Sequence, residues 1–216
     1  MKKLSRSPII AFLCLAMSVV ALASFFGCSD GSNADTEETS AFTGLPEYDP
    51  EHITDYVKPF EYTGLTVSVG KDETVSEKVW NTVCDSAQII AYPAPQVEYY
   101  AEQERIKYKY YSKEYGIAYD ELLRSLGITE ESIYDTAKSM VKNDLVLEYI
   151  IADADITLSD AEKAAHTDKY AEKFTELYGY DTDYIKEHML DQVYSSMLYD
   201  KTVEYLILNN TVSKTE

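Results

Sequence analysis

The stretch that decides the fold is residues 79–147, VWNTVCDSAQIIAYPAPQVEYYAEQERIKYKYYSKEYGIAYDELLRSLGITEESIYDTAKSMVKNDLVL. Apolar residues recur at helical spacing through most of this stretch. A Tyr-Pro-Ala-Pro segment at 92–95 interrupts the pattern, and Gly116 and Gly127 end it twice more. The sequence therefore predicts helices over residues 72–90, 96–115, 119–126 and 130–154.

The C-terminal part continues the helical pattern. Ser159 and Glu162 have the spacing of a capping box, so a helix should begin there and end at Gly179. Asp181 can cap a last helix over 182–208. All of the predicted helices except the one at 119–126 are about 20 residues or longer, which exceeds the usual ~11–12 and favours extended arms over a compact ball.

One short segment before the helices has strand character. Residues 60–69, FEYTGLTVSV, alternate apolar and polar residues and are rich in β-branched side chains. A single strand needs a partner, and Thr211–Ser213 is a weak candidate. We therefore expect a mainly α fold: an elongated multi-helix domain with helical arms over 60–216, plus one short strand region near 60–69.

Charge and composition limit the possible partners. Of the 216 residues, 38 are acidic and 19 basic, which gives a formal charge of −19. Nucleic acid phosphates would repel such a chain, so no nucleic acid partner is expected. Tyrosine is the outlier at 20 residues, and its apolar body and polar tip suit both helix seams and half-exposed interfaces.

The first 27 residues are typical of a targeting segment, with a basic start and the apolar run IIAFLCLAMSVVALASFF. Two processing sites compete. Ala21-Leu22-Ala23 fits a small-x-small cleavage site, whereas Phe25-Phe26-Gly27-Cys28 resembles a bacterial lipobox with lipid attachment at Cys28. The polar residues that follow suit a tether over 28–59. A lipoprotein anchored outside the cytoplasm at the cell membrane is the leading prediction, with plain secretion or a retained helix as alternatives.

The search for chemistry finds no catalytic motif, and no catalytic residue, metal site or cofactor is predicted. His52, His166 and His188 are far apart in sequence. Of the three cysteines only Cys84 would remain free after lipidation, and its apolar neighbours predict a buried structural thiol.

Tyrosines gather within residues 99–119, and on one helix they cannot all share one side. Some should therefore face solvent or a cleft. With adaptable methionines they form the predicted binding residues: Tyr99, Tyr100, Tyr108, Tyr111, Tyr115, Tyr119, Met140, Met189 and Met197.

The order of these pieces resembles the C-terminal domain of the trigger factor family of folding chaperones. The matching segments are YTGLTVSV at 62–69, VWNTVCDSAQIIAYP at 79–93, the stretch from YGIAYDELLRSLGITEES to ADITLSD at 115–160, and DKTVEYLILNNTVS at 200–213. The resemblance covers about residues 56–213 and implies a helical cradle, similar to that of SurA-type chaperones, that binds non-native chains without ATP. It implies that the tyrosines and methionines named above are the client-binding residues.

The chain departs from that family where Val69 is followed directly by the helix expected from Asp72. No room is left for the FKBP-type isomerase domain, and no ribosome-docking domain precedes it, so neither activity is expected. The sequence thus predicts a membrane-tethered, ATP-independent chaperone-like protein for unfolded or nascent exported polypeptides. The alternatives are an adaptor lipoprotein with one specific partner and a divergent peptidyl-prolyl isomerase.

Overall fold

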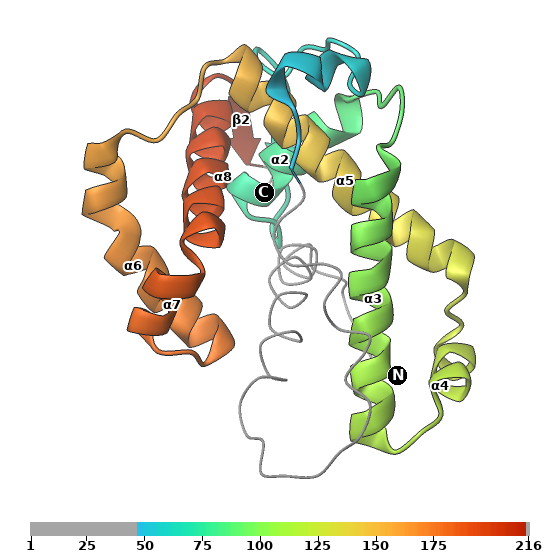
Figure 1. The fold of residues 1–216 in the computed structure, drawn as a ribbon. Helices are drawn as coiled ribbons and strands as arrows, with labels where there is room; N and C mark the ends of the chain where they lie inside the picture. Colours follow the sequence, from blue (N-terminus) through green and yellow to red (C-terminus); the bar gives the residue numbers. More distant parts are fainter. Residues whose placement is uncertain (1–46, 215–216) are drawn as a thin grey trace. The chain divides into compact units, whose positions relative to one another are not determined.

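A computed structural model gives the structure of the chain, and it describes residues 47–214. The described part is mainly helical, as predicted (Figure 1). Its elements in chain order are the 3-10 helix η1 (Pro50–Asp55), β1 (Thr66–Val69), α2 (Val75–Ser86), α3 (Ala94–Tyr115), α4 (Tyr119–Leu126), α5 (Glu130–Asp153), α6 (Asp160–Tyr178), α7 (Thr182–His188), α8 (Leu190–Leu208) and β2 (Thr211–Lys214).

Contacts within the chain cluster into two compact units, where the sequence suggested one domain. Within the described residues, unit 1 holds Tyr92–Val141, preceded by Glu47, and unit 2 holds Tyr48–Ala91 and residues 142–214. Helix α5 begins in unit 1 and ends in unit 2. The elongated, trigger factor-like arrangement remains a prediction.

Unit 1 is built on the hairpin of α3 and α4. Gly116 ends α3 and Gly127 ends α4, each with a left-handed backbone at φ 63° and 68°. Glycine adopts this conformation without steric cost, so both helices stop where the sequence predicted. Thr129 then starts α5, since its hydroxyl accepts a hydrogen bond from the Ser132 N–H at 3.1 Å.

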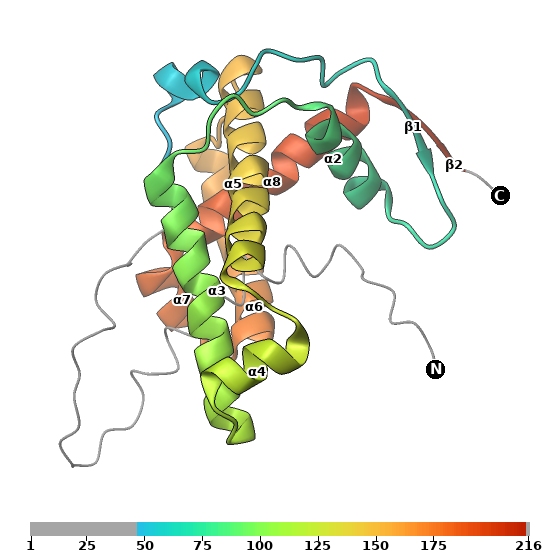
Figure 2. The same cartoon turned by 90° about the vertical axis from the view of Figure 1, so that its right-hand side faces the viewer.

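Unit 2 contains a two-stranded parallel sheet that packs on α2 (Figure 2). β1 pairs with β2 in the register Val67↔Val212, so the weak strand partner expected at the C-terminus is confirmed. β1 is shorter than the predicted strand and begins only at Thr66. Its side chains alternate, with Val67 and Val69 buried and Thr66 and Ser68 exposed.

The last predicted helix is divided into α7 and α8 at Met189. The Met189 backbone leaves the helical region at φ −131° and ψ 24°, although no proline or glycine is nearby. The bend lets α7 pack on α6 while α8 packs on α2 and α6. Ile185, Met189 and Val193 are all buried around it, so tertiary packing is the cause of the break.

Part of the expected linker is folded in unit 2. Residues 50–55 form η1, capped by Asp49, and Ile53 and Val57 are buried. Val57 forms an isolated antiparallel bridge with Ile89. The Val57 N–H donates to the Ile53 C=O at 3.0 Å, so the chain makes an α-type turn there, which keeps the two apolar side chains on the same side.

In each unit, tyrosine hydroxyls donate hydrogen bonds to carboxylates that are distant in sequence. These tyrosine–carboxylate pairs are Tyr48–Asp144 at 2.9 Å, Tyr134–Glu98 at 2.6 Å, Tyr170–Asp200 at 2.6 Å and Tyr62–Asp153. Each pair joins residues at least 30 positions apart in sequence. Much of the tyrosine excess therefore has a structural use, because a phenol supplies a donor where basic residues are too few.

Candidate functional site

The predicted client-binding tyrosines lie along α3 and at the start of α4, but they differ widely in exposure. Tyr100 is buried at 2% exposure, and its ring makes an edge contact with Tyr99 at 5.2 Å. Tyr115 is exposed at 68%. The remaining members are half-buried: Tyr99, Tyr108, Tyr111 and Tyr119. The expectation that some tyrosines face solvent is thus confirmed, while client contact itself remains a prediction.

The predicted methionines are core residues. Met140, Met189 and Met197 are 9%, 5% and 4% exposed. Met140 belongs to the unit 1 part of α5, and the other two belong to the α7–α8 region of unit 2. They share no common surface patch, and their burial assigns them to packing in this conformation.

Four large apolar side chains of the α3–α4 hairpin are exposed: one in the last two turns of α3, two at the turn between the helices, and one at the last residue of α4. We call this group the hairpin tip and define it as Tyr110, Tyr115, Ile117 and Leu126, which are 38%, 68%, 37% and 56% exposed. The rings of Tyr110 and Tyr111 are 5.9 Å apart, so the tip continues into the half-buried tyrosines of α3. Several large apolar side chains exposed on one hairpin suggest an interaction surface more strongly than a single exposed residue does.

Sequence reasoning identified only Tyr115 of these four as a site residue. Tyr110 was not among the predicted tyrosines. Ile117 follows Gly116 at the end of α3, and Leu126 precedes Gly127 at the end of α4. Leu126 continues an apolar pattern with the buried Leu122 and Leu123, and that pattern does not distinguish an exposed position from a buried one. The available signal was the nearness of Ile117 and Leu126 to glycine turns, where side chains have few neighbours.

Exposed charged residues of both signs lie on the same hairpin. Lys113, Glu114, Asp120, Glu121 and Arg124 are all exposed there. Burial, and next the charge of Glu130, raises the pKa of Tyr119, so its hydroxyl stays protonated at neutral pH. The hairpin therefore exposes both apolar and charged side chains, a combination found at protein-binding surfaces.

Arg105, midway along α3, contacts the start of α5. Its guanidinium contacts Glu98 at 2.8 Å, Glu102 at 3.2 Å and Glu130 at 3.0 Å, and it lies 5.3 Å from the ring centroid of Tyr134. The hydrogen bond from Tyr134 and then the Arg105 contact lower the pKa of Glu98. This arginine clamp joins α3 to the start of α5 and positions the hairpin.

Two polar residues of α3 are buried among its apolar ones. Gln103 is 1% exposed, and neither polar atom of its amide has a hydrogen-bond partner among the described residues. Glu104 is 2% exposed and forms an ion pair with Lys107. The buried side of α3 is therefore not uniformly apolar, a feature that the periodicity of the sequence did not reveal.

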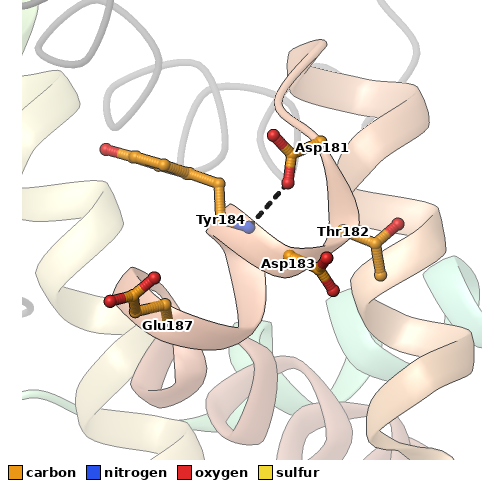
Figure 3. Close-up of a pocket in the computed structure, with 5 residues that line it drawn as sticks. All are labelled: Asp181, Thr182, Asp183, Tyr184 and Glu187. Carbon is orange, nitrogen blue, oxygen red and sulfur yellow. Dashed lines mark hydrogen bonds between the residues drawn. The ribbon is translucent and has the colours of Figure 1, made fainter.

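A separate open depression lies at the start of α7 in unit 2 (Figure 3). Asp181, Thr182, Asp183, Tyr184 and Glu187 line its volume of about 500 Å³. Asp181 caps α7, as predicted, by accepting a hydrogen bond from the Tyr184 N–H at 2.8 Å. The walls are acidic, and no group of three metal-ligating side chains suited to an ion occurs within residues 47–214.

Cys84 is a buried free thiol in α2, as the sequence predicted. Burial raises the pKa of this thiol to about 12, although the charge of Lys142 acts in the opposite direction. His52, His166 and His188 are exposed. The proposed lipid attachment at Cys28 lies outside the described residues.

Membrane insertion can be judged only for the described helices. From η1 to α8, no helix is both long and apolar enough to span a bilayer.

Comparison with known proteins identifies no relative. No family model, no curated protein and no solved structure matches the chain. The resemblance to the trigger factor C-terminal domain therefore rests on the sequence segments quoted above.

Proposed function

We propose that the chain is a membrane-tethered, ATP-independent chaperone-like protein that binds non-native, exported polypeptides. The observation that carries the proposal is the hairpin tip, where four large apolar side chains are exposed within one hairpin of unit 1. A non-native chain exposes apolar side chains, and contact with the tip would remove both surfaces from water.

The chemistry of the tip suits varied clients. Tyrosine gives a large contact area with only a few rotatable bonds, so little conformational entropy is lost on binding. Its hydroxyl can also donate to client backbone oxygens. The surrounding charges and the acidic chain would keep a complex in solution, and the lipid expected at Cys28 would hold it at the membrane.

The test is suppression of aggregation by the chain from residue 29 onward, which retains every described residue and lacks the lipid. Two unrelated denatured proteins are diluted with stoichiometric amounts of this chain, at low and at moderate salt. Suppression of both at both salt concentrations supports a promiscuous apolar surface. Suppression of neither refutes the proposal and favours an adaptor with one specific partner.

Variants of the tip locate the activity. Replacing Tyr115, Ile117 and Leu126 together by serine should abolish most of the suppression. The matched control is Leu177→Ser, because Leu177 is also exposed, at 49%, but belongs to α6 in unit 2. These are surface changes, so each variant should keep its stability within about 0.5 kcal/mol per substitution. Equal suppression by the triple variant and the control would refute the assignment to the tip.

A further inference from the structure

The parallel sheet of unit 2 has two strands, so each strand has a paired side and an outer side. Unpaired strand edges present backbone donors and acceptors that other strands can bind, and folded proteins usually cover or shorten them. Of the two strands, β2 is the more exposed. Thr211, Ser213 and Lys214 are exposed and Val212 is half-buried, whereas every second residue of β1 is buried.

The register shows which backbone groups of β2 point outward. The Thr211 N–H donates to the Leu65 C=O at 2.8 Å, so Thr211 faces β1. Successive residues of a strand direct their backbone groups to alternate sides. Ser213 therefore also faces β1, and the N–H and C=O groups of Val212 and Lys214 point to the outer side.

Apolar side chains accompany this edge. Val212 is in register with Val67, so its side chain continues the apolar face that Val67 and Val69 turn towards α2. Val67 is 1% exposed, and burial decreases from there to the half-buried Val212. An additional strand beside β2 would pair the outward groups and cover apolar surface.

We propose that the outer edge of β2 binds an extended segment of a client polypeptide as a third strand, with alternate apolar side chains against Val212. Donors and acceptors at two-residue spacing are matched by another β-strand, in either direction. A second copy of this chain is disfavoured as the occupant because each copy carries a formal charge of −19. The inference rests on the proposed chaperone function and adds a backbone-directed site to it.

The experiment uses the full chain in a mild detergent and a short peptide of alternating valine and threonine with a lysine at each end. A second peptide with proline at alternate positions is the control, since it cannot form a strand. Hydrogen exchange is measured at individual amides, and peptide affinity is measured by fluorescence anisotropy. Bound peptide should slow exchange at Val212 and Lys214, and the proline peptide should not.

A substitution in β2 tests peptide binding at the outer edge without altering the fold. Val212→Pro removes one outward N–H, and proline is tolerated on an edge strand. One hydrogen bond lost should weaken peptide binding roughly threefold to tenfold. Thr211→Ala is the matched control, because its backbone faces β1 and its side chain is exposed. Its affinity should be unchanged, and the thermal midpoints of both variants should match that of the unaltered chain.

Several results would overturn the inference. The first is that the peptide does not bind, and the second is that it binds while amide exchange at Val212 and Lys214 is unchanged. The third is that Val212→Pro binds the peptide as tightly as the unaltered chain. The fourth is that amide exchange at Val212 and Lys214 slows with increasing protein concentration in the absence of peptide. The last result would identify a second copy as the occupant. If the chain suppresses aggregation but does not bind the peptide at β2, only the proposed binding at the strand edge is refuted. If the chain binds the peptide but does not suppress aggregation, the chaperone proposal is refuted.

Discussion

Replacing Arg105 by alanine should destabilise unit 1 by an amount that its contacts define. The Arg105 side chain is 17% exposed, while its partners Glu98, Glu102 and Glu130 are 45%, 25% and 58% exposed. Solvent weakens each ion pair to roughly 0.5 kcal/mol, and the contact with the Tyr134 ring contributes a similar amount. Arg105→Ala should therefore lower the free energy of unfolding by about 2 kcal/mol.

The measurement is urea unfolding followed by circular dichroism, with hydrogen exchange read for residues 94–115 and 130–141. The loss should appear as faster exchange in both segments, because the clamp joins α3 to α5. Arg105→Lys keeps the charge but cannot reach three carboxylates in the same way, so it should restore less than half of the loss.

Arg124→Ala is the matched control, since Arg124 is an exposed arginine of the same hairpin. Its effect should stay below about 0.5 kcal/mol. An Arg105→Ala variant that differs from this control by less than that amount would refute the clamp as a stabilising unit.

Three further predictions concern single groups. Because burial raises the pKa of Cys84 to about 12, a thiol reagent should react slowly at neutral pH until denaturant is added, and fast reaction in the native state would contradict the burial. Burial also raises the pKa of Glu148, so the ionised carboxylate destabilises the folded state at neutral pH. Glu148→Gln should therefore raise the thermal midpoint at neutral pH. The gain should disappear at acidic pH, where the Glu148 carboxyl is protonated. Tyr134→Phe removes the donor to Glu98, whose folded pKa is lowered, so about 1 kcal/mol should be lost above roughly pH 5. That difference should shrink as pH falls through the folded pKa of Glu98, and a difference constant with pH would contradict the assignment.

Local signals in the sequence predicted most helix boundaries. Gly116, Gly127 and Gly179 end their helices in left-handed conformations, and Ser159 with Glu162 forms the expected capping box. These signals act within a few residues, so no tertiary information was needed. The partner of β1 was also identified, because its short run of β-branched residues was the remaining candidate near the end of the chain.

Features that depend on distant contacts were not predicted. The bend at Met189 has no proline or glycine to announce it, and η1 lies in a proline-containing stretch that is typical of a linker. For the site, pattern alone could not separate the buried Tyr100 from the exposed Tyr115, since both lie on one side of α3. Which side of a helix is covered depends on its neighbours in space, and those neighbours come from elsewhere in the sequence.

The tyrosine–carboxylate pairs have a consequence for the environments in which this fold can persist. The donor in each pair is a neutral hydroxyl, as in Tyr170 with Asp200, so the attraction is a short-range hydrogen bond. Dissolved ions screen attraction between opposite charges but have little effect on such a bond. Hydrogen bonds of this kind should persist from low to high salt concentration. A fold stabilised mainly by lysine–carboxylate ion pairs would lose stability over the same range.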